Sequence, residues 1–467
     1  MQDSCLRPRT GFWALLLALL LVAHAVRAKD PPLPAYNADP AQSSISGISS
    51  GAYMAVQFAT AWSSVIHGVG AVAGGPYGCA EGSVATALST CMLGVPATDL
   101  QSLLRRTEGW SRSGAIDPLA NLARQHVYLF SGYNDAVVAR SVTDTLRDFY
   151  AHYLGADHRA NLFYQTAIGA GHAQVTTSFG ARCADNGGSF INRCDYDQAG
   201  IILQHIYGAL HPPGAGLPHG AILRFAQAAF TKPASPADDS LGDTGFAYVP
   251  QDCAAMQACR VHIALHGCKQ SYGDIGEAYV LHAGYNAWAD ANRIIVLYPQ
   301  ARAEAFTPEG GSNPEGCWDW WGYLDAAPMD APAYLLKSGR QIGAIKAMLD
   351  RLTSRAADAI PAAAAMAATA PEMFGAIDAS DHAIDLAWSV VPGASRYDVF
   401  RAAPADADFR RIGSTDGLSY ADPGLQPETT YRYRVRVSSA TPGPFSATVT
   451  RTTRPPVPHC VEPGTCR

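Results

Sequence analysis

The chain has 467 residues, of which 48% are hydrophobic and 16% charged, and its 34 basic and 40 acidic side chains give a net charge of −6. This composition excludes an intrinsically disordered chain, which needs low hydrophobicity and high charge, and it excludes collagen-like and coiled-coil architectures. It also lacks the basic field by which proteins bind nucleic acid or anionic lipid. We therefore expect a neutral or mildly polar ligand, and enough chain for one large domain and one small one.

The N-terminus has the pattern of an export signal. Arg7 and Arg9 precede an apolar run over residues 11–26, and a small-residue cleavage pattern ends at Ala28. The run is shorter than the ~20 apolar residues that a membrane-spanning helix needs. We expect a signal peptide over residues 1–28 that is removed after export, rather than a retained anchor. This predicts a secreted protein, with a periplasmic location as the alternative.

The eleven cysteines agree with export. Removing the signal removes Cys5 and leaves an even number, as expected for disulfides in an oxidising compartment. Pairing between neighbours along the chain would give five disulfides, although sequence alone does not fix the connectivity. They are Cys79–Cys91, Cys183–Cys194, Cys253–Cys259, Cys268–Cys317 and Cys460–Cys466. A zinc site is disfavoured, because the chain has no C-x-x-C pair and no Cys/His cluster at ligand spacing.

Residues 29–355 alternate short apolar runs with helical stretches. Strand-like runs occur at 126–135, 261–267 and 293–300, and stretches with helical periodicity occur at 141–154 and 276–292. Strands that are apolar throughout fit a parallel sheet covered by helices on both faces. The segment is therefore predicted to be an α/β domain.

The composition changes at residue 356. Residues 356–371 are rich in Ala and Pro and predict a linker. Residues 372–453 contain several short strands of alternating polarity, which predict an all-β sandwich. A cysteine-containing tail follows over residues 454–467.

The predicted sandwich resembles a fibronectin type III domain. Trp388 is placed like the core tryptophan of an early strand, and Tyr431 is placed like the tyrosine of a tyrosine corner before a late strand. The resemblance implies a spacer or a weak surface-binding module without chemistry of its own.

The most informative stretch is SGISSGAYM, over residues 46–54. Gly47, Ser49 and Gly51 match the nucleophile elbow G-x-S-x-G, in which a serine lies on a tight turn between a strand and a helix. The residues that follow have helical spacing, as the elbow requires. Because such a short pattern also fits an ordinary turn, a nucleophilic serine requires a histidine and an acid elsewhere in the chain.

Two residues downstream can complete a catalytic triad. Asp135 ends a strand-like run at a turn, and His172 follows another strand-like run. Their order after Ser49 is that of an α/β-hydrolase. Either residue alone could instead serve a turn or a surface. Three other histidines lie in helical stretches and are weaker candidates for the base: His152, His158 and His205.

Acyl transfer also needs backbone N–H donors for the developing oxyanion, each worth roughly 3 kcal/mol. Ser50, directly after the nucleophile, supplies one. The second donor usually lies on a loop before the serine, but only about twenty residues separate Lys29 from Ser49. A strand that runs into His266, Gly267 and Cys268 could supply it from far downstream. The fold would then be circularly permuted, which is feasible because chain ends often lie close together.

Five motifs occur in the order GISSGAYM, VYLFSGYND, GAGHA, HGCKQ and GCWDWWGY. Together they resemble the catalytic domain of extracellular poly(3-hydroxybutyrate) depolymerases, in the branch whose oxyanion loop follows the triad. The resemblance implies a circularly permuted α/β-hydrolase fold that needs no metal or organic cofactor. It implies Ser49 as nucleophile, Asp135 as orienting acid and His172 as general base and acid. It also implies the amides of Ser50 and Cys268 as oxyanion donors.

Residues 316–323 hold four aromatic side chains in six positions. Core packing would account for one or two of them, but such a cluster beside a site also suits a groove for an aliphatic polyester. We expect substrate to be contacted by Tyr53, His266, Trp318, Trp320 and Trp321. A disulfide between Cys268 and Cys317 would tie this segment to the oxyanion loop, or would serve stability alone.

The resulting hypothesis is a secreted serine esterase that acts on poly(3-hydroxybutyrate) or related short-chain polyhydroxyalkanoates. The alternatives are an esterase for feruloyl or acetyl groups of polysaccharides or for short oligomers, and a surface-binding protein without activity. Family members commonly carry a separate polymer-binding domain, and the short tail over residues 454–467 is too small for one. Amorphous polymer and oligomers are therefore substrates to test beside crystalline polymer.

Overall fold

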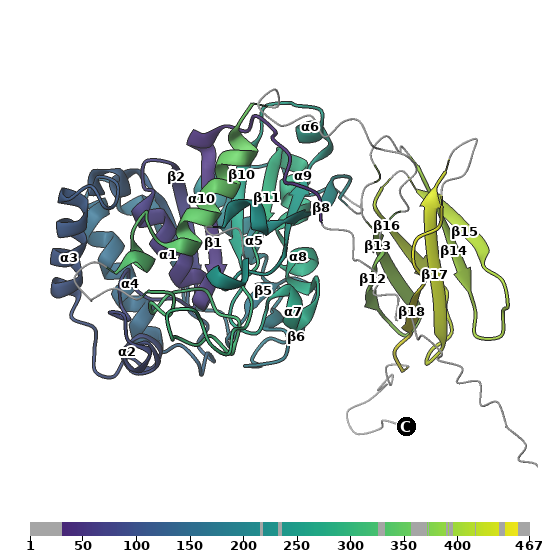
Figure 1. Cartoon of the computed structure of the whole chain (residues 1–467). Helices are drawn as coiled ribbons and strands as arrows, with labels where there is room; N and C mark the ends of the chain where they lie inside the picture. The colour runs from purple at the N-terminus through teal and green to yellow at the C-terminus, as the bar shows by residue number, and fades with distance from the viewer. Residues whose placement is uncertain are drawn as a thin grey trace, which may run out of the picture.

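The computed structural model describes residues 30–214, 218–231, 236–325, 332–355, 371, 373–388, 391, 396–415, 417–438 and 444–455. These residues form two units (Figure 1). An α/β unit extends from η1 (Pro40–Gln42) to α10 (Arg340–Thr353), and a β-sandwich extends from β12 (Met373–Ala379) to β18 (Val449–Thr452). The expected signal peptide, nearly all of the expected linker and most of the tail lie outside the described residues.

A sheet of eight described strands forms the centre of the α/β unit, in the order β4-β3-β2-β1-β10-β11-β9-β8. Its strands are β1 (Ser43–Ile48), β2 (Ile66–Val72), β3 (His126–Phe130), β4 (Leu162–Gln165), β8 (Ala221–Ala226), β9 (Thr244–Val249), β10 (Arg260–Leu265) and β11 (Ile294–Tyr298). The sheet is parallel from β4 to β11, as the apolar runs predict. It is mixed as a whole, because β9 runs antiparallel to β11 and β8.

The strand order is circularly permuted. β1 is the first strand in the chain but lies in the middle of the sheet, between β2 and β10. β10 follows some two hundred residues later, and its Leu265 is in register with Gly47. The two ends of the unit meet, because the amides of Tyr36 and Ala38 donate to the carbonyl of Leu352 at the end of α10. Adjacent ends make such a rearrangement physically simple.

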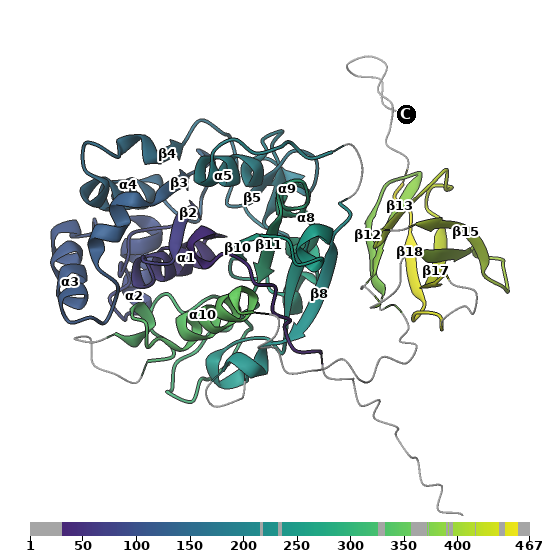
Figure 2. The ribbon, with the colours of Figure 1, turned by 90° about the horizontal axis from the view of Figure 1, so that it is seen from above.

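Helices cover both faces of the sheet, as Figure 2 shows from above. One hydrophobic cluster packs α1, α3, α4 and α10 against the sheet, and another packs α5, α8 and α9. The bounds of the α-helices before α10 are α1 (Ser50–Ala61), α2 (Val84–Leu88), α3 (Leu100–Arg112), α4 (Arg140–Leu154), α5 (Gln198–Tyr207), α6 (Gln251–Ala254), α7 (Tyr272–Ile275), α8 (Ala278–His282) and α9 (Tyr285–Asn292). The single helix expected over 276–292 is instead broken, because Gly284 takes a left-handed conformation with φ +96°.

Four disulfides join residues along the α/β unit: Cys79–Cys91, Cys183–Cys194, Cys253–Cys259 and Cys268–Cys317. They confirm four of the five neighbour pairings, and the fifth, between Cys460 and Cys466, lies outside the described residues. The second disulfide closes a loop that contains β7, the central strand of a small sheet of order β5-β7-β6. Its strands are β5 (Gln174–Thr176), β6 (Ala181–Arg182) and β7 (Ile191–Arg193).

The C-terminal unit is a sandwich of the fibronectin type III arrangement, as expected. In the described residues one sheet has the order β12-β13-β16 and the other β15-β14-β17-β18. Trp388 is buried in the core between the sheets. The hydroxyl of Tyr431 accepts the amide of Gln426 at 3.1 Å, which is the predicted tyrosine corner. The other strands are β13 (Ala383–Trp388), β14 (Tyr397–Ala402), β15 (Arg410–Thr415), β16 (Ser419–Pro423) and β17 (Thr430–Val437).

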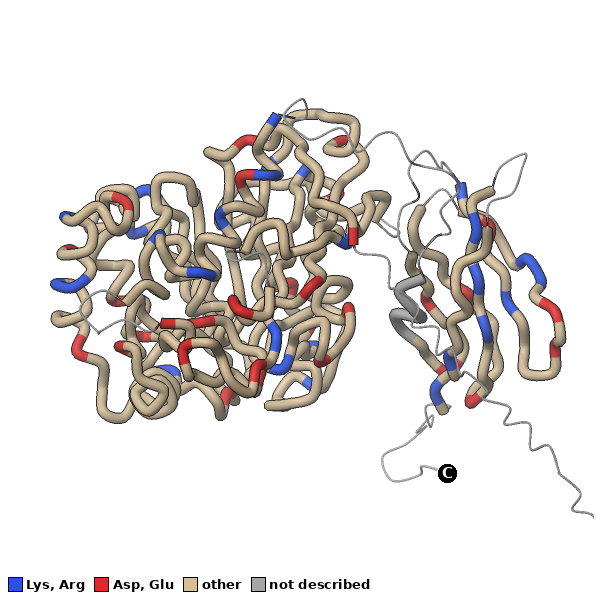
Figure 3. The backbone as a smooth tube through the Cα atoms, in the orientation of Figure 1, with Lys and Arg blue, Asp and Glu red and all other residues tan. Residues whose placement is uncertain are grey.

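Charged residues of both signs are scattered over the described part of the α/β unit, and no large basic block occurs among them (Figure 3). Among the residues that the structure describes, no helix is both long and apolar enough to cross a membrane.

Candidate active site

Ser49 lies on the tight turn between β1 and α1, in the strained conformation of a nucleophile elbow. Its φ of 55° and ψ of −123° put a non-glycine residue in a sparsely allowed region, which costs ~1–3 kcal/mol. The two motif glycines make this turn possible. A Cβ on Gly47 would lie 2.3 Å from the carbonyl oxygen of Gly51, and a Cβ on Gly51 would lie 2.3 Å from that of His266. No larger residue fits at either position without movement of the backbone.

Asp135 and His172 form a buried pair at the carboxyl ends of β3 and β4. The Nδ1 of His172 lies 2.9 Å from Oδ2 of Asp135, and the two side chains are 5% and 2% exposed. The other carboxylate oxygen, Oδ1, accepts the amides of Val137 and Val138 at 2.8 and 2.9 Å. The acid is therefore fixed by the backbone on one side and orients the imidazole on the other, so that Nε2 is the ring nitrogen left for a substrate-side partner.

The loop after β10 packs directly against the elbow. A Cβ on Gly267 would lie 3.2 Å from Cβ of Ser49. The amide of Gly267 donates to Oε1 of Gln270, and the amide of Lys269 donates to the carbonyl of Glu315, both at 2.7 Å. Between them, the amide of Cys268 has no acceptor among the described residues. The loop thus offers a free N–H donor beside the serine, as an oxyanion hole requires.

Ser50 provides a second candidate donor at the first position of α1, where helix amides have no partner within the helix. Its amide likewise has no acceptor in the described part of the chain. Its hydroxyl accepts the amide of Trp318 at 3.4 Å, which connects the elbow to the aromatic segment.

One cavity of about 490 Å³ contains Ser49, His172 and Cys268 in its lining. The spatial proximity that the permuted loop requires is therefore present. Most of its wall is aliphatic or aromatic, from Val84, Ala87, Leu88, Met92, Val137, Val138, Phe190, Trp320 and Trp321. The ion pair between Lys269 and Glu315, with 2.7 Å between Nζ and Oε2, also lines the cavity and has exposed side chains.

Three of the five expected substrate contacts line this cavity: Tyr53, Trp320 and Trp321. Tyr53 and Trp320 stack with their ring centroids 4.2 Å apart, and Trp321 packs edge-on against Trp320. These rings form a continuous aromatic wall beside the elbow.

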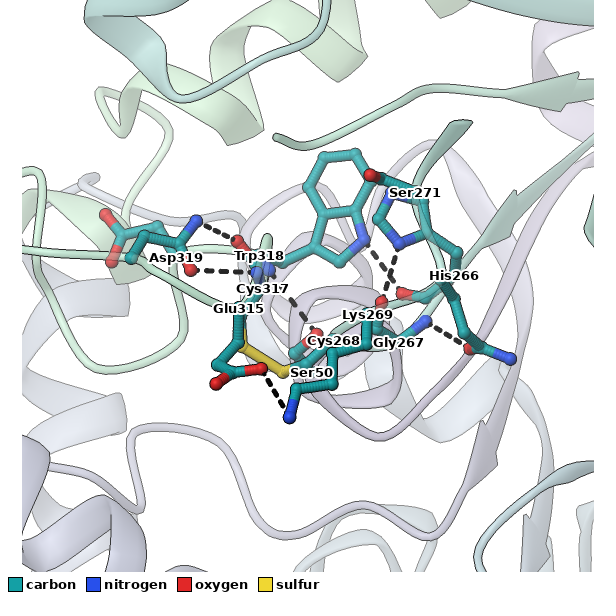
Figure 4. Close-up of a disulfide and its surroundings, with 12 residues drawn as sticks. Ser50, His266, Gly267, Cys268, Lys269, Ser271, Glu315, Cys317, Trp318 and Asp319 are labelled. Carbon is teal, nitrogen blue, oxygen red and sulfur yellow. Dashed lines mark hydrogen bonds and ion pairs between the residues drawn. A yellow bond between two sulfur atoms is a disulfide. The ribbon is translucent and has the colours of Figure 1, made fainter. Parts of the chain in front are cut away.

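The other two expected contacts, Trp318 and His266, are fully buried and lie outside the cavity lining, which corrects that expectation. The indole of Trp318 donates to the carbonyl of His266 at 3.0 Å (Figure 4). The Nε2 of His266 accepts the amide of Ala301, and its Nδ1 lies 2.7 Å from the carbonyl of Gly267. Burial lowers the pKa of His266 to about 4, so the ring is neutral and holds the oxyanion loop in place.

A buried carboxyl shapes the turn that presents the aromatic wall. Oδ1 of Asp319 accepts the amides of Gly322 and Tyr323, both at 2.9 Å, and burial raises the pKa of Asp319 to about 8. The Cys268–Cys317 disulfide joins this segment to the oxyanion loop, and Figure 4 shows the two backbones held side by side.

Sequence reasoning assigned no role to Asn186, Phe190 or Gln270, which also line the cavity. Asn186 and Phe190 belong to the loop closed by Cys183–Cys194, where no motif marks them. Gln270 lies inside the HGCKQ motif, but only its contacts show what it binds. Among the described residues no cluster of three or more His, Cys, Asp or Glu side chains is arranged to hold a metal ion.

The fold and this geometry define a serine ester hydrolase of the α/β-hydrolase class with a permuted strand order. The chain is 40% identical over 412 residues to the poly(3-hydroxybutyrate) depolymerase of Delftia acidovorans, covering 87% of this chain and 78% of the relative. It is 38% identical over 323 residues to the polyhydroxybutyrate depolymerase of Talaromyces funiculosus, covering 67% and 91%. The chain therefore belongs to the poly(3-hydroxybutyrate) depolymerase family.

Two solved structures resemble the α/β unit. The crystal structure of PHB depolymerase from Penicillium funiculosum is 35% identical, with a TM-score of 0.60, over 69% of this chain and 98% of that one. The same values hold for a serine-to-alanine variant of PHB depolymerase complexed with an R3HB trimer. No family model matches the chain.

Proposed function

We propose that this protein hydrolyses the backbone esters of poly(3-hydroxybutyrate), or of related short-chain polyhydroxyalkanoates, to oligomers and monomers. The observation that carries the proposal is the free amide of Cys268 beside Ser49, in the cavity that also contains His172. Family membership supports the substrate class, since both relatives are named for depolymerisation of polyhydroxybutyrate.

The first half of the reaction acylates the serine. Oγ of Ser49 attacks the ester carbonyl carbon while Nε2 of His172 takes the hydroxyl proton, and Asp135 stabilises the imidazolium. The carbonyl oxygen becomes an oxyanion that accepts the amides of Ser50 and Cys268. Collapse of this intermediate breaks the ester C–O bond. His172 returns its proton to the departing alcohol oxygen, which leaves an acyl ester on Ser49.

The second half releases the acid. His172 takes a proton from water, whose oxygen attacks the acyl carbon and forms a second oxyanion in the same donor pair. Breaking the acyl–Oγ bond returns the proton to Ser49 and releases a 3-hydroxyacyl chain with a carboxylate end. The protonation state of His172 is then restored, so the cycle needs only ester and water.

The cavity wall favours a polyester over a polysaccharide ester. Trp320, Trp321 and the aliphatic residues around them offer apolar contact to the methyl-bearing repeat, and most of the exposed cavity wall is apolar. A carbohydrate substrate would bring several hydroxyl groups that need partners when they lose water.

We further propose that the protein is secreted after removal of residues 1–28. Four disulfides in the α/β unit support an oxidising compartment. The proposed domain boundaries are 29–355 for the hydrolase and 372–453 for the fibronectin type III unit, with residues 356–371 as linker.

The test is clearing of a poly(3-hydroxybutyrate) suspension by the mature protein and by its Ser49→Ala variant. We expect clearing by the wild-type protein and none by Ser49→Ala, with both proteins equally folded by circular dichroism. Ser113→Ala, at the exposed C-terminal end of α3, is the matched serine control and should clear normally. Clearing by Ser49→Ala would refute the nucleophile. Release of ferulate from feruloyl polysaccharide, without clearing, would assign the other esterase function.

A further inference from the structure

Apart from Ser49 and Ser50 on the turn between β1 and α1, the catalytic groups lie on three separate loops: the acid after β3, the histidine after β4 and the oxyanion donor of Cys268 after β10. We propose that the disulfide-closed loop over residues 183–194, here called the clamp loop, holds these three loops in fixed positions relative to one another. Asn186 and Gln270 are the positioning residues. This inference rests on the proposed function and assigns a role to residues that touch none of the reacting atoms in the mechanism above.

Asn186 joins the acid loop to the histidine. Its Oδ1 accepts the amide of His172 at 2.8 Å and the amide of Ala136 at 3.0 Å. Its Nδ2 donates to the carbonyls of Asn134 at 3.0 Å and Ala184 at 3.2 Å. Asn134 and Ala136 flank the catalytic acid, so one amide side chain fixes the backbone of both members of the acid–base pair. A side chain that lacks either the accepting oxygen or the donating nitrogen, or that is shorter, cannot make all four bonds.

Gln270 joins the oxyanion loop to the same clamp loop. Its Oε1 accepts the amide of Gly267 at 2.7 Å, and its Nε2 donates to the carbonyls of Ser189 and Phe190 at 2.8 and 3.0 Å. Gln270 as a whole is only 1% exposed, so these bonds face little competition from water. The ring of Phe190 packs edge-on against His172 at 6.0 Å between centroids. The clamp loop thus contacts the histidine and the oxyanion loop through adjacent residues.

The clamp loop is built to hold a fixed shape. Cys183 and Cys194 close it, and Nδ2 of Asn192 donates across it to the carbonyls of Cys183 and Asp185 at 3.0 and 2.7 Å. The amide of Gly171, next to the catalytic histidine, donates to the carbonyl of Cys183 at 2.8 Å. A Cβ on Gly171 would lie 2.1 Å from the carbonyl oxygen of Asp185, so the two loops touch backbone to backbone.

Two neutral truncations test the proposal: Asn186→Ala and Gln270→Ala in the full-length protein. A loss of alignment of about 1 Å costs up to ~10²-fold in rate, so we expect each variant to lower kcat about 10- to 100-fold on a soluble p-nitrophenyl ester. KM should change less than about threefold, because the amide groups of both residues are already bonded to the protein backbone. The double variant should lose less than the product of the two single losses, since both act through one loop.

Asn292→Ala is the matched control. Asn292 also ties segments together through its amide, with bonds to both backbone groups of His211 and to the carbonyl of Trp288, but it lies at the end of α9, outside the cavity. It should lower the melting temperature as much as Asn186→Ala while leaving kcat unchanged. The Cys183→Ala/Cys194→Ala variant should lower kcat in the same way as Asn186→Ala.

Three results would overturn the proposal while Ser49→Ala still abolishes clearing. They are an unchanged kcat in folded Asn186→Ala and Gln270→Ala, a rise in KM at constant kcat, and an equal loss of kcat in Asn292→Ala. The second result would mean that Asn186 contacts the substrate. The third would mean that the clamp loop affects activity only through the overall stability of the protein. If wild-type protein itself shows no esterase activity, the proposed function fails instead.

Discussion

The substitution Gly51→Ala adds one methyl group at the contact between α1, the helix after the nucleophile elbow, and the end of β10, the strand before the oxyanion loop. The new Cβ would lie 2.3 Å from the carbonyl oxygen of His266 and 2.5 Å from that of Leu265, where ordinary contact begins at 3.4 Å. Both obstacles are backbone atoms at the end of β10, so neither can rotate away. The start of α1 and the end of β10 must therefore separate by about 1 Å.

This separation acts directly on the two proposed oxyanion donors. The amide of Ser50 precedes Gly51 on α1, and the amide of Cys268 follows His266 on the loop after β10. Donors must lie about 2.7–3.1 Å from the oxyanion, and loss of one lowers kcat about 10²–10³-fold. We expect a loss of that size in Gly51→Ala, together with ~1–3 kcal/mol of destabilisation from overpacking.

The assay is kcat on a soluble p-nitrophenyl ester, with thermal unfolding measured on the same samples. Gly343→Ala in α10 is the matched control, because a Cβ there would meet no atom within 4 Å. Alanine should stabilise that helix by ~0.5–1 kcal/mol and leave kcat unchanged. A folded Gly51→Ala protein with wild-type kcat would show that this close approach does not position the oxyanion donors.

Three further changes test other parts of the site. Asp135→Asn should lower kcat about 10⁴-fold with unchanged folding, because an amide stabilises the wrong tautomer of His172; single-turnover kinetics with near-UV circular dichroism checks this. Trp321→Ala should raise KM for oligomers several-fold and leave kcat on the small ester unchanged, since it removes cavity wall and no reacting group. Burial raises the pKa of Asp319 from 3.8 to about 8, so its stabilising contribution is complete below about pH 4 and lost as pH rises through about 8. The melting temperature should therefore drop less between about pH 5 and pH 9 in Asp319→Asn than in the wild-type protein. An equal drop in both proteins would contradict the reasoning.

Much of the architecture follows from local sequence patterns. The mostly apolar runs that form β3, β10 and β11 predict buried strands because apolar side chains lie on both faces, and the turns after them are marked by Gly, Pro, Asn or Asp. Three disulfide pairings within the α/β unit also follow from proximity along the chain, since short loops bring their ends together readily, whereas Cys268–Cys317 spans 49 residues. The helix over 276–292 was predicted wrongly as one element, because periodicity alone does not register the break at Gly284.

The aromatic segment shows the limit of such patterns. The sequence WDWW places four adjacent side chains in one short turn but does not say which ring faces the cavity. Trp318 turns inward to bond the carbonyl of His266, while Trp320 and Trp321 face the cavity. Asn186 carries no sequence signal, because a lone amide in a loop is common. Gln270 lies inside the HGCKQ motif, but the motif does not show its partners, which are set by segments far along the chain.

The linear sequence by itself determined the residue types for acyl transfer, their order and the permuted placement of the oxyanion motif, since each depends on local geometry or on chain order. Only the tertiary structure decided that β10 lies beside β1, that the amide of Cys268 is left without an acceptor, and that one disulfide-closed loop contacts all three catalytic segments. These are contacts between residues up to some two hundred positions apart, and they depend on how the whole sheet assembles, which no local pattern records.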